Sequence, residues 1–372
     1  MGKRYFRNKI ISIFMAAILF GSGWLTGWQG VKAAGTEENS KLLEVHYMDV
    51  GQGDATLIKS GGHAMLIDAG NNSKGTAVQN YLQKQGIKKL DYVIGTHPDA
   101  DHIGGLDVII YKFDCTNVLL PDFSKDTKTY EEVADTLKAK NYKAVHPKVG
   151  DTYRLGDASF TVTAPADRKF SSANDYSVAV RLEHGDNHFL FVGDAEEESE
   201  EEMLKTNQEL SSDVYKVSHH GSRTGTTEEF LKAVNPGYAV ISCGEDNSYG
   251  HPHAEVMNLL RKEGIKVFRT DQQGTIVAVS DGKKITWNTS PDESWKAGEP
   301  KGTRSDAEPA ADAWKDEKSK ETYVLNTNSK KIHLSSCGSV KRMKDKNKKK
   351  TKKSLKQLEN EGYTPCQSCI EK

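Results

Sequence analysis

A ten-residue stretch, Thr96 to Gly105, restricts the possible folds of this chain more than any other part of the sequence. It follows the apolar run Tyr92-Val93-Ile94, which is typical of a buried strand. The stretch contains four potential metal ligands: His97, Asp99, Asp101 and His102. A loop at a strand end brings such side chains to one point in space, where they can hold two divalent cations that activate water.

Potential ligands of the same kind recur at the ends of other apolar runs. They are Asp49 and Asp54 in a glycine-rich turn, Asp68 after residues 64–67, Asp194 after 189–192, His219 and His220 after 215–217, and His251 and His253 before a helical stretch. Each signal is weak alone, because a carboxylate after a strand usually forms a turn. The repetition favours one shared metal site, in which carboxylates such as Asp49, Asp54 and Asp68 orient neighbouring ligands.

The first part of the chain has the features of an export signal. Residues 1–33 combine a positively charged start with an apolar core at 10–20 and a plausible cleavage site after Ala33. We therefore expect a secreted protein with a short linker at 34–41. The alternative is an uncleaved membrane anchor, because the apolar segment extends through Trp24 and Trp28.

The 372 residues are enough for one large domain and one small domain, and the net charge of -1 points to no partner. From 42 to 290, short apolar strands alternate with helical stretches, which predicts two sheets with helices packed outside. Gly61-Gly62 predicts a hairpin turn, and the spacing over 76–85 predicts a helix. Residues 291–320 are polar and irregular and predict a linker before a module at 321–372.

The motifs at 48–54, 67–70, 96–105, 174–177, 192–194, 219–222 and 250–253 resemble those of metallo-β-lactamase-fold hydrolases. They are most similar to the soluble domain of ComEC-type competence proteins, which serve DNA uptake. The resemblance covers roughly residues 42–288. It implies an α/β fold, a four-layer αββα sandwich with a metal site at one sheet edge.

The resemblance also implies a set of metal ligands. His97 and Asp99 would help to bind a first metal, Asp101 and His102 a second, and Asp194 would bridge them, with His219 or His220 completing a shell. Asp99 stands where many members have histidine. Asn174 and Ser177 lie where many members have a further histidine, and they are expected to orient the metal ligands through hydrogen bonds. Both departures make the site richer in oxygen, which favours manganese over zinc.

The activity implied by the resemblance is phosphodiester hydrolysis by metal-activated water. Asp101 would orient that water. His251 or His253 could bind phosphate or protonate the leaving oxygen. A structural role for His253 is the alternative, because it is placed to cap the helix that follows Pro252.

The C-terminal module carries a second potential metal site. His333 and Cys337 form one closely spaced pair and Cys366 and Cys369 form another, a pattern that fits a structural zinc. A disulfide within this set is the alternative. The pairs flank residues 341–356, which hold ten Lys or Arg and one acid. The segment loosely resembles the metal-binding module of Ada-type DNA repair proteins, which implies nucleic-acid binding, DNA above all.

Three functions from different classes remain. We favour an exported metal-dependent phosphodiesterase or nuclease that acts on extracellular DNA or RNA. A hydrolase of a small ester, lactam or phosphorylated metabolite is the second, and a shallow acidic cleft without basic rim residues would favour it. The third is a non-catalytic DNA-binding protein, which the retained ligand series argues against.

Overall fold

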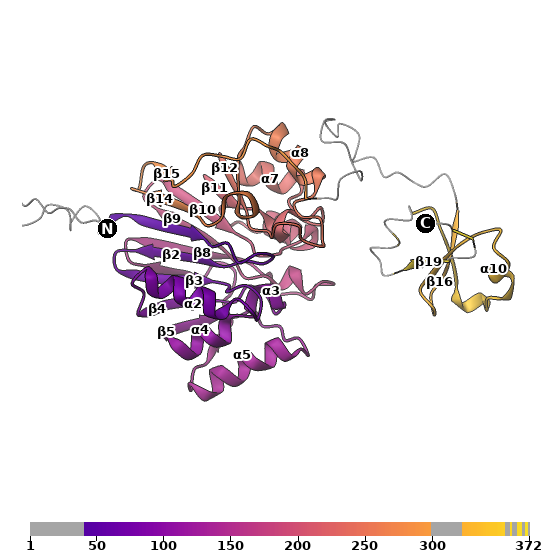
Figure 1. Cartoon of the computed structure of the whole chain (residues 1–372), viewed down its shortest axis with the longest axis horizontal. Helices are drawn as coiled ribbons and strands as arrows, with labels where there is room; N and C mark the ends of the chain where they lie inside the picture. Colours follow the sequence, from indigo (N-terminus) through magenta and orange to yellow (C-terminus); the bar gives the residue numbers. More distant parts are fainter. Residues whose placement is uncertain (1–40, 299–321, 354–357, 359–362, 367–368, 371–372) are drawn as a thin grey trace, which may run out of the picture. The chain divides into compact units, whose positions relative to one another are not determined.

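The computed structural model describes residues 41–298, 322–353, 358, 363–366 and 369–370 (Figure 1). The expected export signal and most of both expected linkers lie outside the described residues. Within the described part of the chain, no helix has the length and apolar character needed to cross a membrane.

The first sheet has eight strands, and both ends of the hydrolase-like region contribute to it. In spatial order they are β15 (Ile285–Trp287), β14 (Ile276–Ser280), β1 (Leu43–Tyr47), β2 (Thr56–Ser60), β3 (His63–Ile67), β4 (Lys89–Ile94), β5 (Asp114–Leu119) and β6 (Ala144–Val145). The predicted hairpin joins β2 to β3. Gly61 and Gly62 form its turn with φ values of 55° and 82°, which residues with a side chain rarely adopt.

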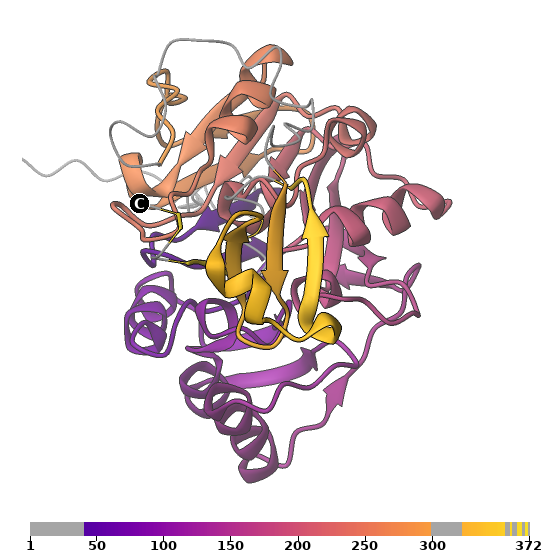
Figure 2. The same ribbon diagram turned by 90° about the vertical axis from the view of Figure 1, so that its right-hand side faces the viewer.

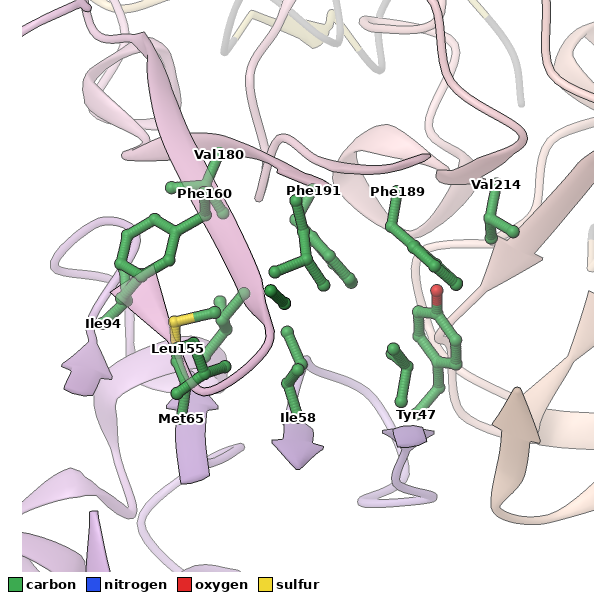
Figure 3. Packing of buried hydrophobic residues seen from close by; sticks show 14 of the residues in the cluster. Tyr47, Ile58, Met65, Ile94, Leu155, Phe160, Val180, Phe189, Phe191 and Val214 are labelled. Carbon is green, nitrogen blue, oxygen red and sulfur yellow. The ribbon is translucent and has the colours of Figure 1, made fainter. Parts of the chain in front are cut away.

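The second sheet has seven strands and packs face to face on the first. In order they are β13 (Lys266–Arg269), β12 (Tyr238–Ile241), β11 (Val214–Lys216), β10 (Asn187–Phe191), β9 (Ala179–His184), β8 (Ala158–Ala164) and β7 (Thr152–Leu155). Figure 3 shows Phe189 and Phe191 of this sheet pointing toward Tyr47 and Ile58 of the other. Alternate residues of each strand thus bury one face in a common core.

Helices cover the outer faces of both sheets. The first sheet carries α2 (Gly75–Lys84), α4 (Leu106–Lys112) and α5 (Lys128–Ala139), and the second carries α6 (Glu197–Lys205), α7 (Glu228–Val234) and α8 (Ala254–Lys262). Val78 of α2 and Ile109 of α4, for example, are buried in one cluster with Leu66 of β3. The expected four-layer αββα arrangement is confirmed (Figures 1 and 2).

Two segments differ from the sequence-based expectation. The ligand-rich stretch is not a plain loop, because α3 (Ala100–Ile103) begins inside it and α4 follows after Gly104-Gly105. The second difference is at 291–298, which we assigned to the linker. This segment packs on the domain: the Asp292 amide donates to the Val267 carbonyl, and the Gly298 amide donates to the Pro252 carbonyl.

The C-terminal module has a sheet of its own. Its strands lie in the order β18 (Lys348–Thr351), β16 (Tyr323–Asn326), β17 (Lys331–Leu334) and β19 (Thr364–Pro365), and α10 (Gly338–Arg342) follows β17 (Figure 2). The core of the module is small and includes Tyr323, Leu325, Ile332, Leu358 and Tyr363. So small a core gives little stability alone, which makes a metal or covalent staple important.

Candidate metal centre

The candidate metal centre lies where strands of both sheets end at the same edge. In the first sheet, β3 and β4 run parallel, so Asp68 and His97 follow their carboxyl ends side by side. In the second sheet, β10 and β11 also run parallel, and they lead to Asp194 and His220. Short turns after these strands, including α3, complete the set. The strand-end series therefore converges, as its spacing predicts.

Potential ligand atoms gather here in overlapping groups. Atoms within 4.8 Å of one another come from His97, His102 and Asp194 in one group, and from Asp101, His102 and His220 in another. Asp54 joins two further groups, one with Asp194 and His220 and one with Asp68 and His102. Shared members make this a single cluster with room for more than one cation.

Asp194 is the centre of the cluster. Its carboxylate lies 3.1 Å from His102 Nε2, 3.4 Å from His220 Nε2 and 4.0 Å from His97 Nε2. His220 Nε2 is also 3.3 Å from the Asp101 carboxylate. A carboxylate in contact with histidines of both expected metal positions has the place of a bridging ligand.

Several polar atoms of the cluster are buried without a hydrogen bond. His97 Nε2 has no partner, and Asp194 Oδ1 lies close to His102 but out of hydrogen-bond alignment. An unpaired buried polar atom costs about 1–3 kcal/mol. A cation between these atoms would satisfy them together, so the residues fit the divalent metal that such a site is expected to hold.

The neighbours of each histidine turn its Nε2 toward the centre. Asp68 contacts His102 Nδ1 at 2.8 Å, and the Asp68 carboxylate also accepts from the Thr96 amide and hydroxyl. His220 Nδ1 lies 2.9 Å from the Ser242 carbonyl, an acceptor that fixes the tautomer. These contacts orient the ligands, as outer partners of metal-binding histidines do.

The charges of the cluster are strongly coupled. Burial opposes protonation of His102 and His220, yet nearby carboxylates, Asp194 first, raise the pKa of both imidazoles well above the ordinary value. Burial instead lowers the pKa of His97 to about 4. Without a cation, the carboxylates thus favour the protonated form of both imidazoles. A bound cation would replace those protons, so metal binding is expected to release them.

The structure distinguishes between His219 and His220, which the sequence leaves open. The short turn η3 (Ser218–Gly221) gives both residues positive φ values, 46° and 55°. The imidazole of His220 is buried in the cluster, whereas that of His219 is partly exposed, with Nδ1 3.2 Å from Glu196. His220 belongs to the groups of potential ligands, whereas His219 does not, although its Nε2 atom also lies 3.6 Å from the Asp194 carboxylate.

Asp99 is not drawn into the tight cluster. It lines the hollow above the centre, but its carboxylate forms an ion pair with Lys125 at 2.6 Å. A cation ligated by Asp99 would compete with the Lys125 ammonium group for the same carboxylate oxygen. The role of Asp99 as a metal ligand stays a prediction. The motif at 96–105 does not predict the contribution of Lys125.

The outer residues of the expected set lie in different places. Ser177 Oγ is 3.3 Å from His97 Nδ1 and accepts the Asp194 amide. Asn174 lines the hollow and donates to Glu196. Asp49 is exposed, accepts from the Gly51 amide and lies outside the groups of potential ligands.

The two histidines before α8 have different surroundings. His251 lines the hollow, with Nδ1 3.5 Å from the Gln52 amide nitrogen. His253 occupies the N-cap position, yet its side chain makes no capping hydrogen bond, so the capping alternative is wrong. Its Nδ1 accepts the Arg223 amide instead. The buried His253 thus helps to fix the turn that contains Arg223.

Sequence reasoning missed a buried lysine beneath the centre. Lys216 of β11 is almost fully buried and pairs with Asp54 at 2.9 Å, while donating to the Val217 carbonyl. This pair presents Asp54 to His220, whose Nδ1 lies 3.2 Å away. The available signal was an isolated charge in the apolar run Tyr215-Lys216-Val217.

The C-terminal module contains a separate group that could hold a metal ion. Its ligand atoms lie within 4.8 Å of one another and come from His333, Cys337, Cys366 and Cys369. The three cysteines are free thiols, and His333 Nδ1 is buried without a partner. Contact with His333 lowers the pKa of Cys337 to about 6, which favours the thiolate that metals bind.

Comparison with known proteins agrees with this geometry. Residues 48–245 match the family model of the metallo-β-lactamase superfamily. The chain belongs to the metallo-β-lactamase superfamily. Its fold implies divalent metal binding, and as a metallo-β-lactamase-fold protein the chain is a metal-dependent hydrolase by family.

Relatives of this metallo-β-lactamase-fold chain include competence-associated proteins. It is 33% identical over 251 residues to ComE operon protein 3 of Bacillus subtilis, covering 63% of this chain and 32% of that protein. It is 29% identical over 257 residues to competence protein ComA of Neisseria gonorrhoeae, covering 68% and 34%. The chain thus spans about a third of the length of these relatives.

Solved structures of the superfamily align with the chain at low identity. The metallo-β-lactamase fold protein YhfI of Bacillus subtilis is 14% identical to this chain, with a TM-score of 0.42. The alignment covers 64% of this chain and all of YhfI. The diiron β-hydroxylase CmlA of Streptomyces venezuelae is 13% identical, with a TM-score of 0.42, and the alignment covers 61% and 52%.

Proposed function

We propose that this protein is an exported, metal-dependent phosphodiesterase that cuts extracellular nucleic acid, with DNA as the favoured substrate. The observation that carries the proposal is the buried cluster around Asp194, with the unpaired Nε2 atom of His97 facing it. The competence-associated names of the relatives support a nucleic-acid substrate.

In this proposal the chemistry is divided between cations and side chains. Bound divalent cations supply an acidified water and neutralise charge on the phosphoryl group. Asp194 would hold the cations together with the histidines around it, and Asp101, on the more exposed side of the cluster, would orient the attacking water. Burial and neighbouring histidines lower the pKa of His251 to about 3, so it is neutral near pH 7 and offers an N–H to a phosphate oxygen.

Export and cation identity belong to the same proposal. The features of residues 1–33 support secretion, with a retained anchor as the alternative. The replacement of family histidines by Asp99, Asn174 and Ser177 supports manganese over zinc in the hydrolase centre, although Asp99 lies outside the groups of potential ligands. The module's set of one histidine and three cysteines supports one structural zinc.

One observation favours a second candidate function. The hollow above the centre is lined by Asp99, Asp101 and Asp194 among its charged residues, and neither lysine nor arginine lines it. Such an acidic hollow suits a small ester or phosphorylated metabolite better than a polyanion. Lys125, paired with Asp99 at the margin, is a compensating charge in the proposed nuclease.

The test uses the full chain, stripped of metal and kept in mild detergent. Plasmid, linear and single-stranded DNA are incubated with Mn²⁺, Mg²⁺ or Zn²⁺ in turn. Asp101→Ala is expected to lower cleavage at least about 100-fold, since outer partners of metal ligands alone are worth 10- to 100-fold. Circular dichroism checks that the variant stays folded.

Two results would contradict the proposal. Unchanged turnover in folded Asp101→Ala would exclude this centre as the source of activity. Absence of DNA cleavage with every cation, in a protein shown to bind metal, would transfer the assignment to the small-molecule hydrolase.

A further inference from the structure

A cavity of about 480 Å³ lies in the hydrolase domain, outside the metal centre. Its volume is within the ~300–1,000 Å³ typical of small-molecule sites. Residues that line it include Asp122, Pro147, Lys148, Pro165, Arg168 and Tyr176. None of these residues belongs to the metal cluster, so the cavity is a separate feature that needs its own explanation.

One short turn forms part of both the cavity and the metal centre. In η2 (Asn174–Tyr176), Asn174 lines the hollow over the metal centre and Tyr176 lines the cavity. Two residues of chain span at most about 7 Å. The next residue, Ser177, contacts His97 directly. The two hollows are therefore close neighbours with a thin wall between them.

A second segment completes that wall. Asp122 lines the cavity, and Lys125, three residues later, pairs with Asp99 at the metal centre. Between them, Phe123 stacks on Tyr176 with ring centroids 4.0 Å apart and an interplanar angle of 11°. Two segments distant in sequence thus meet through an aromatic pair on the border of the two hollows.

The wall is held firmly in place. The Tyr176 hydroxyl accepts the Phe170 amide, and the Phe170 ring meets Tyr176 edge-on. The buried Asp175 carboxylate accepts the amides of Glu196 and Ser199 at the start of α6. The cavity is therefore preformed, because its aromatic wall is fixed by backbone hydrogen bonds as well as by ring packing.

We propose that this cavity is a nucleotide subsite, which holds the base and sugar of the nucleotide next to the phosphate at the metal centre. The inference rests on the proposed function and names its substrate class. Pro147 and Pro165 give apolar walls, and the ring of Tyr176 gives an aromatic surface to a base. Bases stack on such surfaces with little regard to sequence.

Charges of both signs line the cavity, with Asp122 and Asp167 beside Lys148 and Arg168. Arg168 is held by Glu198 and Glu202 and is neutralised there. Lys148 is exposed, and no ion pair joins it to any described residue, so its ammonium is available to the next phosphate along the strand. A base that is paired in a duplex cannot enter a cavity, which makes single strands and frayed ends the substrates.

The test fills the cavity. Ala166 also lines it, and Ala166→Trp in the full chain places an indole where the base would lie. We expect kcat/KM for a single-stranded 12-mer to fall about 5- to 150-fold, the factor that stacking of one base supplies. Hydrolysis of methyl p-nitrophenyl phosphate, which carries no nucleoside, should be unchanged. Ala134→Trp, at an exposed position of α5, is the matched control.

A binding measurement separates this inference from the proposed function. In an Asp101→Ala background with Mn²⁺, a trinucleotide containing 2-aminopurine is titrated, and its quenching reports stacking. Loss of quenching with Ala166→Trp supports the subsite even if the wild-type protein cleaves no DNA, a result that would reject the nuclease alone. Equal binding and equal kcat/KM in Ala166→Trp and Ala134→Trp would overturn the subsite. If the melting temperature of Ala166→Trp is lower than that of the wild type, Val149→Trp replaces it and fills the cavity from another lining position.

Discussion

At the scale of single residues, Asp68 shows how one carboxylate can orient the other ligands of a metal centre. It has a φ of 57° at the end of β3 and accepts from Thr96 twice, while it contacts His102 Nδ1. Asparagine tolerates the same backbone region with little strain. A change of Asp68 to asparagine therefore alters charge and hydrogen bonding and leaves the local shape intact.

We expect Asp68→Asn to weaken metal affinity about 10- to 100-fold, because His102 loses the acceptor that fixes its tautomer. Isothermal titration with Mn²⁺ measures the effect. The control is Asp91→Asn, a carboxylate of β4 that accepts the Ala64 amide away from the centre. Equal affinity in both variants would show that Asp68 is structural and does not support the metal.

The sequence predicted which residue types converge, and it did so from their positions after strands. It could not choose between His219 and His220, because the choice depends on the left-handed turn at 218–221. It also gave little sign of Lys216 or Lys125. Both pair with partners far along the chain, and such pairings are visible only after the sheets are assembled.

At the scale of elements, α6 and α7 are joined by a buried carboxyl group. Glu200 of α6 accepts the amides of Thr226 and Thr227 at 2.6 and 2.8 Å, and Thr227 is the N-cap residue of α7. Burial raises the pKa of Glu200 to about 8, despite these hydrogen bonds. Residues 196–202 contain six glutamates, a composition that predicts an exposed helix face, yet Glu200 among them is buried.

A raised pKa in the folded state makes stability fall as pH rises. Between pH 5 and pH 8 the unfolded chain has lost the Glu200 proton and the folded chain retains it. The free energy of unfolding should therefore drop by up to about 1.4 kcal/mol per pH unit from this group. Urea denaturation of wild type and Glu200→Gln over this range measures it. The slope should be flatter in the variant, and identical slopes would contradict a protonated Glu200.

Element prediction succeeded where periodicity was strong. The sequence predicts helices at 197–205 and 254–262, and these ranges match α6 and α8. The prediction of a loop over 96–105 failed at α3, which lies just before Gly104 and Gly105. Those glycines are required by close packing instead, because a side chain on Gly105 would lie 2.4 Å from the Ala69 carbonyl oxygen.

At the scale of the whole molecule, the module at 321–372 is proposed to hold nucleic acid for the hydrolase. Lys349 and Lys350 of β18 are exposed and belong to the lysine-rich run. Deletion of the module should weaken DNA affinity and flatten its salt dependence, by about 0.9 in log–log slope for each duplex phosphate that the protein no longer neutralises. Fluorescence anisotropy at several salt concentrations measures both.

Hydrolysis of a small phosphodiester should survive the deletion. The double variant Lys349→Gln/Lys350→Gln keeps the module and removes two charges, so it should give a smaller change in the same direction. DNA affinity that is equal in all three proteins would show that the module does not anchor nucleic acid.

The layered fold could be predicted from the alternation of strands and helices in the sequence. The packing of 291–298 could not be predicted, because it depends on backbone hydrogen bonds that the polar composition of the segment does not reveal.

The potential ligands are divided between the two sheets, and this division sets an order of events. Asp68, His97, Asp101 and His102 belong to the first sheet and its turns, whereas Asp194 and His220 belong to the second. Neither sheet alone presents the shared carboxylate together with the histidines on both sides of it. The groups that include Asp194 or His220 form only after the two sheets have docked, so a cation bound by them would report the completion of folding rather than begin it.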